Sequence, residues 1–62
     1  MLTDNIKRIR KEKRMTQKEL GQKMGSSQSA VFLIESGQRD PTYGTLQRMA
    51  NALDVTVADL VK

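Results

Sequence analysis

The fold is decided by residues 16–41, which read TQKELGQKMGSSQSAVFLIESGQRDP. The stretch opens on a capping box. Thr16 is followed three residues later by Glu19, and each side chain can accept a hydrogen bond from a backbone N–H that the start of a helix leaves without a partner. This pattern predicts a helix over about residues 17–24. Gly25 comes directly afterwards and favours the left-handed backbone conformation that ends a helix.

A second helix is predicted after a very short turn. Ser27 is a good N-cap for a helix over Gln28–Glu35, and Gly37 indicates its end. Helices joined by so short a turn cross steeply, which leaves the second one free to project from the domain. Gly21 lies inside the first helix, where glycine costs about 1 kcal/mol relative to alanine. We therefore expect a neighbouring helix to pack very close to Gly21.

Two longer helices flank this pair. The N-terminal pattern predicts a helix over about Asp4–Lys13, with Thr3 or Asp4 as its N-cap. Another helix is predicted between Thr42, its N-cap, and Asp54, its end. Both carry apolar residues at helical spacing, so we expect these residues in the core: Leu2, Ile6 and Ile9 in the first helix, and Leu46, Met49, Ala50 and Leu53 in the second.

A last short helix completes the predicted fold. Thr56 and Asp59 form a second, weaker capping box, and the helix that follows carries Val57, Leu60 and Val61. No segment alternates apolar and polar residues with a period of two. The sequence therefore predicts an all-α fold of five short helices in a single domain over residues 1–62.

Size and composition exclude most kinds of active site. A chain of 62 residues buries only about 60% of the surface that its unfolded form exposes, which leaves little room for both a core and an enclosed cavity. The sequence contains no His and no Cys. It therefore lacks the commonest general base, the usual metal ligands and the thiol nucleophile. We expect no enzyme, no cofactor and no metal site.

Positive charge is concentrated at one end of the chain. Residues 1–24 carry 8 basic and 3 acidic side chains, whereas residues 25–62 carry 3 and 4. A one-sided basic surface suggests a polyanionic partner, either nucleic acid or an anionic membrane, although a solvated helix face has the same composition. The longest apolar run, residues 30–34, is far shorter than the roughly 20 residues of a membrane span. We expect a cytoplasmic protein without a membrane partner.

The two sides of the helix over Gln28–Glu35 differ in character. On a helical wheel, Ala30, Val31 and Ile34 lie on the side that faces the core. A projecting helix fits the major groove of B-DNA, where glutamine can form paired hydrogen bonds with adenine. The opposite side is thus a candidate base-contacting surface, made of Gln28, Ser29, Phe32 and Leu33.

The same stretch resembles the phage-repressor (Cro/XRE-type, lambda-repressor-like) helix-turn-helix family. The resemblance rests on residue types at fixed spacing, and the five-helix layout extends it over essentially the whole chain, with the helix-turn-helix unit at about residues 17–35. The matching positions are Gly21, Gly25, Val31, Ile34, Glu35, Gly37, Arg39 and Pro41.

The resemblance implies a function as well as a fold. Members of this family are sequence-specific double-stranded DNA-binding regulators of transcription, most often repressors. Such a regulator works on the nucleoid. A single module buries too little surface for tight specific binding, so we expect a homodimer, at least on DNA, at a pseudo-palindromic site. In this family the dimer surface can involve the last helix and the loop before it, which here carry Val55, Val57 and Val61.

Roles for single residues follow from the resemblance. Gln17 matches the position that clamps a DNA phosphate, and Gln28 the position that reads a base. Arg39 matches a basic residue that reaches the DNA backbone or the minor groove. Arg10 and Glu35 match a charged pair that ties the first helix to the third, which is a structural role. Ser29 and Leu33 match further base-facing positions.

Three features of the sequence leave alternatives open. Phe32 and Leu33 stand where polar or basic residues are common, and an exposed apolar pair usually marks a contact surface. They are expected to touch thymine methyl groups, to bind a protein partner as in an antitoxin-like or anti-repressor-like relative, or, for Phe32, to fold back onto the domain. Tyr43 is expected either to reach a phosphate or to pack under the preceding loop. Ser26 replaces an apolar turn residue, so we expect a looser turn or a less stable domain.

Overall fold

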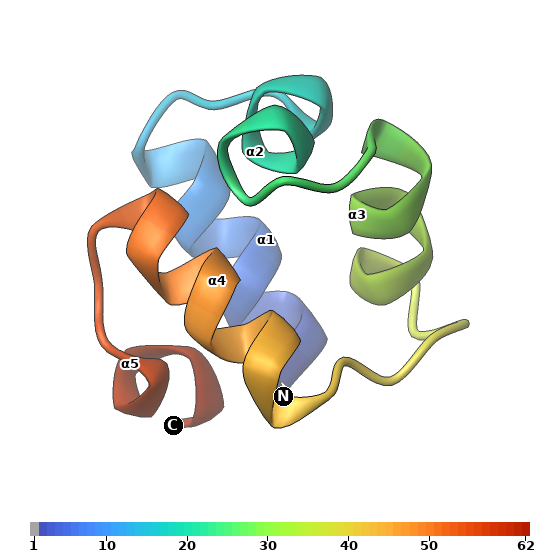
Figure 1. Ribbon diagram of the computed structural model, residues 1–62. Coiled ribbons are helices and arrows are strands. Elements are labelled where there is room, and N and C mark those ends of the chain that lie inside the picture. Colours follow the sequence, from blue (N-terminus) through green and yellow to red (C-terminus); the bar gives the residue numbers. More distant parts are fainter. Residues whose placement is uncertain (1) are drawn as a thin grey trace.

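The computed structural model describes residues 2–62, and these residues form helices and no strand. In Figure 1, α1 and α4 lie in the middle, α2 lies above them, α3 lies to their right and α5 lies at the lower left. The all-α prediction with five helices is confirmed. The elements are α1 (Leu2–Glu12), α2 (Gln17–Lys23), α3 (Gln28–Glu35), α4 (Tyr43–Leu53) and α5 (Val57–Val61).

Both capping boxes are present. The Thr16 hydroxyl accepts a hydrogen bond from the Glu19 N–H at 3.0 Å, and the Glu19 carboxylate accepts one from the Thr16 N–H at 2.9 Å. Thr56 and Asp59 form the same reciprocal pair at the start of α5. Because each carboxylate accepts backbone N–H bonds in its charged form, the pKa values of Glu19 and Asp59 lie below their ordinary values. Ser27 caps α3 by accepting from the Ala30 N–H.

The helix ends also follow the sequence pattern. Gly25 and Gly37 adopt the left-handed conformation after α2 and α3, with φ of +72° and +79°. Asp54 ends α4 in the same conformation, with φ of +58°, although it carries a side chain. These residues turn the chain where the sequence predicts that it turns.

The predicted start of α1 is wrong. The helix begins at Leu2, so Thr3 and Asp4 lie inside it and neither is its N-cap, and it ends at Glu12 rather than Lys13. Leu2 is half-buried and packs against the core. This apolar contact holds the first turn in the helix, and it outweighs the local preference of Thr3 and Asp4 for a capping position.

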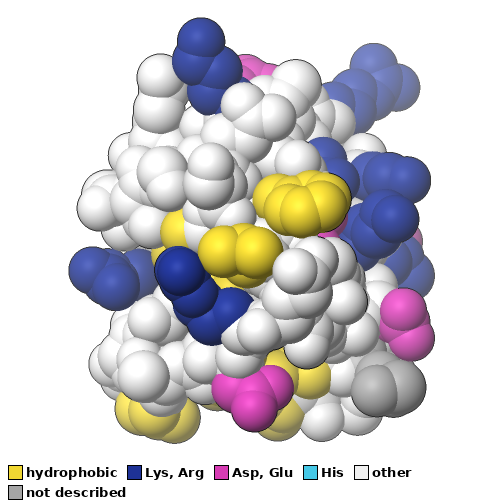
Figure 2. Space-filling view, turned by 90° about the vertical axis from the view of Figure 1, so that its right-hand side faces the viewer, with side chains coloured by type: hydrophobic (Ala, Val, Ile, Leu, Met, Phe, Trp, Pro, Cys, Tyr) yellow, Lys and Arg dark blue, Asp and Glu magenta, His cyan; other side chains and the backbone are white. Residues whose placement is uncertain are grey.

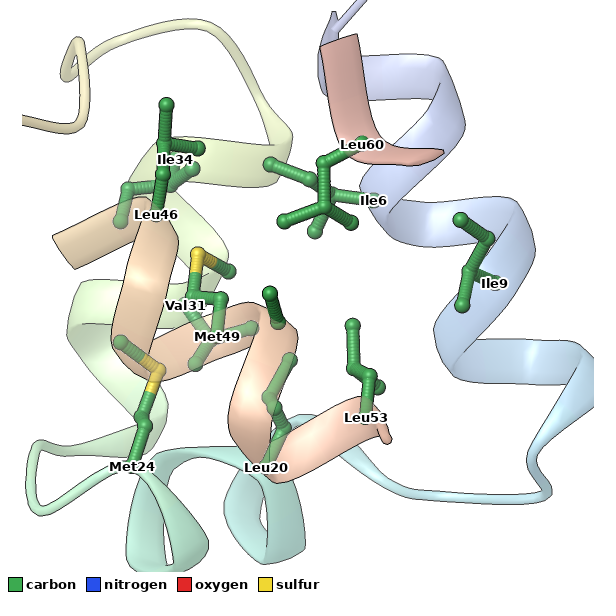
Figure 3. Packing of buried hydrophobic residues seen from close by; sticks show 11 residues of the cluster. Ile6, Ile9, Leu20, Met24, Val31, Ile34, Leu46, Met49, Leu53 and Leu60 are labelled. Carbon is green, nitrogen blue, oxygen red and sulfur yellow. The ribbon is translucent and has the colours of Figure 1, made fainter. Parts of the chain in front are cut away.

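All five helices contribute to one hydrophobic core (Figure 3). The apolar stripe of α4 lies in its middle, between the residues of α1 and those of α3, and Leu60 closes it from α5. Met24 and Met49 are core residues. The buried apolar side chains are Ile6, Ile9, Leu20, Met24, Val31, Ile34, Leu46, Met49, Ala50, Leu53 and Leu60.

Gly21 is the point of closest approach between α2 and the start of α3. A Cβ atom added there would lie 2.6 Å from the carbonyl carbon of Ser27 and 2.9 Å from the backbone nitrogen of Gln28. Such distances are well inside van der Waals contact, and backbone atoms cannot move aside as a side chain can. The close packing predicted at Gly21 is confirmed, and only glycine fits.

We predict that Gly21→Ala lowers the free energy of unfolding by about 1–3 kcal/mol, because the added methyl group forces α2 and α3 apart. Gly44→Ala is the matched control, since a Cβ at Gly44 would meet only the Thr42 hydroxyl, at 3.9 Å. It should leave stability unchanged or raise it by up to about 1 kcal/mol. Urea unfolding of both variants measures this, and equal stabilities would contradict the packing argument.

Within residues 2–62, the helices are too short and too polar for any of them to pass through a lipid bilayer.

Candidate nucleic-acid interface

The helix α3 lies at the edge of the domain and presents one side to solvent (Figure 1). Its inner side is held by Val31 and Ile34, which are buried in the core. Figure 2 views the molecule from the side on which α3 lies. Hydrophobic side chains are exposed in the middle of this face, and Lys and Arg side chains surround them on several sides.

The residues predicted to contact DNA bases come together on this face. Gln28, Ser29, Phe32 and Leu33 line one shallow hollow on the outer side of α3, and Gln17 from the start of α2 joins them. The short turn after α2 brings Gln17 to this position, because it sets the first turn of α2 beside α3. One surface therefore carries amide and hydroxyl groups next to an apolar pair, without a charged side chain in its lining.

Phe32 projects into solvent. Its exposed fraction is 51%, so the expectation that it folds back onto the domain is wrong. The reason is its place on the helix, because Val31 and Ile34 already occupy the side of α3 that faces the core. Leu33 is half-buried beside it.

The predicted ion pair between Arg10 and Glu35 is present and is buried. Nε of Arg10 donates to Oε2 of Glu35 at 2.6 Å, and Nη2 donates to Oε1 at 3.0 Å. The exposed fractions of the two side chains are 9% and 3%. Nη1 of Arg10 donates to the carbonyl oxygen of Met15 at 2.7 Å. The guanidinium group therefore joins α1, the loop that follows it and the end of α3.

Gln17 is attached to this ion pair, which sequence reasoning did not predict. Its Nε2 atom donates to Oε1 of Glu35 at 3.2 Å. The residue expected to clamp a phosphate thus shares a hydrogen-bond network with a pair expected to be purely structural. No periodicity or motif signals this contact, because it joins residues 18 positions apart that only the folded chain brings together.

The loop after α3 and the helix α4 carry the remaining candidate residues. The backbone N–H of Arg39 donates to the carbonyl oxygen of Leu33 at 3.1 Å, which fixes the start of the loop against α3. Tyr43 is 66% exposed, so the expectation that it packs under the loop is wrong. Arg39 lines a second hollow, between the loop and α4. Arg48 of α4 lines the same hollow and adds a second cation there. Helical spacing on α4 could have indicated it, since Arg48 follows Thr45 by three residues.

Ser26 borders this second hollow. Met24 and Ile34 of the core and the half-buried Ala30 also line it, so apolar residues form part of its wall where the turn carries a serine. The turn itself is well bonded, because the Ser26 N–H donates to the carbonyl oxygen of Gly21 at 2.7 Å. The looser turn expected at Ser26 is therefore wrong for the backbone, and a hollow lies beside the turn instead.

The described residues offer no metal centre. No group of three or more Asp, Glu, His or Cys side chains in residues 2–62 is placed to hold an ion. The chemistry of the site is that of hydrogen bonding, apolar contact and positive charge.

Residues 6–60, nearly the whole chain, match the model of the helix-turn-helix family. The chain belongs to this family. The matched family is of the Cro/C1 (XRE) type, and its members are DNA-binding regulators of transcription and not enzymes.

Three relatives show how far the likeness extends. An uncharacterized HTH-type transcriptional regulator of Bacillus subtilis, YqaE, is 39% identical over 62 residues, which cover 100% of this chain and 53% of YqaE. An uncharacterized HTH-type transcriptional regulator of Sinorhizobium fredii, y4dJ, is 39% identical over 98% of this chain and 79% of its own length. The immunity repressor protein of Bacillus phage phi105 is 39% identical over 90% of this chain and 39% of its own length. The chain thus spans about half the length of YqaE and less of the phage protein.

We predict that Glu35→Ala lowers the free energy of unfolding by about 3–5 kcal/mol, because it leaves the buried Arg10 charge without its partner. Glu12→Ala is the control, since Glu12 pairs with Arg8 on the exposed side of α1. It should change stability by less than about 1 kcal/mol. Thermal and urea unfolding measure the stability of both variants. Similar losses of unfolding free energy would show that the buried pair stabilises the domain no more than the exposed pair does.

Proposed function

We propose that this chain is a sequence-specific double-stranded DNA-binding regulator of transcription, a repressor, that reads the major groove with the outer side of α3. The observation that carries the proposal is the hollow on α3, where Gln17 joins four residues that face outward from one helix: Gln28, Ser29, Phe32 and Leu33. The likeness to a protein named as a phage immunity repressor supports the repressor role.

Base reading is assigned to the uncharged residues of α3. Gln28 lies in its first turn and can form two hydrogen bonds with adenine, and Ser29 can donate to or accept from a base. Phe32 and Leu33 supply apolar surface that suits the methyl group of thymine. Since α3 carries no cation, its choice of sequence depends on hydrogen bonds and shape and not on charge.

Contacts with the DNA backbone are assigned to residues that flank α3. Gln17, Arg39 and Tyr43 lie at the start of α2, in the loop after α3 and at the start of α4. Such contacts fix the position of a protein on the duplex without specifying its sequence. Arg39 adds the salt-dependent part of the affinity, because it replaces counterions on the DNA.

We infer that two copies bind together at a pseudo-palindromic site. The Cα atoms of the domain extend over only 24 × 23 × 19 Å, whereas equivalent major-groove sites lie about 34 Å apart. One copy therefore reads one half-site. The candidate dimer surface is the corner between α4 and α5, where Val61 is exposed and Val55 and Val57 are half-buried. A protein with this role works in the cytoplasm, on the nucleoid.

Selection of bound duplexes from a random DNA library, at roughly physiological salt, tests the proposal. Nonspecific phosphate attraction is weak under this condition, so enrichment reports specific contacts. We expect a symmetric consensus with A·T pairs inside each half-site. No enrichment by the folded protein would refute sequence-specific binding.

We predict different effects for a base-reading and a backbone-contacting residue. Gln28→Ala should cost about 1–3 kcal/mol of binding free energy on the selected duplex and relax the preference at one position. Arg39→Ala should weaken binding to all duplexes alike and reduce the salt slope by about one unit. Titrations against the selected duplex and single-base variants measure both. A uniform loss with each variant would show that Gln28 does not read a base.

A second candidate function is supported by the exposure of Phe32. A half-exposed aromatic ring on a helix also suits a protein partner, and in that case the domain would be an interaction module on the same fold. Phe32→Ala separates the two functions. The DNA-reading function predicts loss of preference for thymine in the selected consensus, whereas the interaction module predicts unchanged DNA binding.

A further inference from the structure

We propose that Glu35 is a positioning residue for DNA binding, which holds the side-chain amide of Gln17 in place for its contact with a phosphate. The inference rests on the proposed function, since it needs Gln17 to contact DNA. It gives the buried ion pair a role beyond stabilising the fold.

The geometry of the carboxylate carries the inference. Oε1 of Glu35 accepts from Nη2 of Arg10 at 3.0 Å and from Nε2 of Gln17 at 3.2 Å. Arg10 is itself fixed by two further bonds, one to Oε2 of Glu35 and one to the carbonyl oxygen of Met15. The Glu35 side chain is only 3% exposed, so the acceptor that Gln17 meets is held rigidly by α1 and α3.

The contact determines which way the amide of Gln17 points. An ionised carboxylate only accepts hydrogen bonds, so the NH₂ group of Gln17 and not its oxygen must face Glu35. Nε2 carries two hydrogens, and the bond to Glu35 uses one of them. The other remains for a phosphate oxygen. A donor already ordered in the free protein loses less conformational freedom when DNA binds.

The positive charge of Arg10 allows the Glu35 carboxylate to lie close to the proposed DNA surface. An unpaired negative charge close to the interface would repel the DNA backbone, but the two bonds from Arg10 neutralise Glu35. Gln17 thus gains a strong acceptor without added repulsion. Among the glutamines of residues 2–62, Gln17 alone bonds to a buried charged group, while Gln38 bonds to the exposed Ser36 and Gln47 lies exposed on α4.

A double-mutant cycle on the selected duplex tests the proposal. Glu35→Gln leaves one oxygen for the short bond from Nε of Arg10 and places an NH₂ group where Oε1 accepted from Nη2 of Arg10 and from Gln17, so the amide of Gln17 then faces a donor. We expect Glu35→Gln to weaken binding about three- to tenfold when Gln17 is present and to have little further effect in Gln17→Ala. Binding should weaken although a negative charge is removed, whereas charge alone would tighten it.

Glu12→Gln is the matched control. It removes the same charge from an exposed pair with Arg8 on α1 and has no contact with Gln17. We expect its DNA affinity to stay unchanged or to rise. Replacing the phosphates one at a time by uncharged methylphosphonates gives a second readout. In Gln17→Ala, neutralising one particular phosphate should no longer reduce the affinity. In Glu35→Gln, the same phosphate should lose its effect on the affinity.

A measurement on the unchanged protein guards against a variant that does not fold. In the free protein, ¹⁵N relaxation of side-chain NH₂ groups should show Gln17 to be ordered and Gln47 mobile. Equal mobility of the two amides would overturn the proposal. An equal loss of affinity from Glu35→Gln with and without Gln17 would also overturn it, because Glu35 would then act only through the fold. If Gln17→Ala leaves the affinity unchanged, the phosphate contact assigned under the proposed function is wrong instead.

Discussion

At Gly21 the backbone of α2 lies directly against that of Ser27, and the position of α3 depends on this contact. A Cβ atom would come within 2.6 Å of Ser27, so no other residue allows the two helices to meet with so short a turn. The outer side of α3 and the first turn of α2 then share one surface. Both the hollow on α3 and the bond between Gln17 and Glu35 follow from this approach.

The buried ion pair connects the stability of the domain to its outer surface. Removing two charges from water is costly, and it is tolerated here because the bonds among Arg10, Glu35, Met15 and Gln17 leave no buried side-chain polar atom of the described residues without a partner. The same network begins in the core and ends at a residue of the proposed DNA surface. A purely apolar contact of equal size would hold α1 to α3 but would not orient an amide.

Local signals predicted most of the fold correctly. Thr16, Ser27, Thr42 and Thr56 each cap a helix as expected, because capping depends on a few neighbouring residues and little else. The predicted start of α1 is wrong because it depends on contacts between residues far apart in the sequence. Leu2 packs against residues distant in sequence, and no local pattern contains that contact.

The sequence by itself determined where α2, α3, α4 and α5 begin, which side of α3 faces the core, and which residues are candidates for contact with DNA. These properties follow from hydrogen bonds and periodicities within a few residues of each position. Only the tertiary structure decided that Phe32 and Tyr43 stand exposed, that Arg48 joins Arg39, and that Gln17 is bonded to Glu35. Each of these facts depends on how helices distant in sequence pack together, which is a property of the assembled core and not of any one segment.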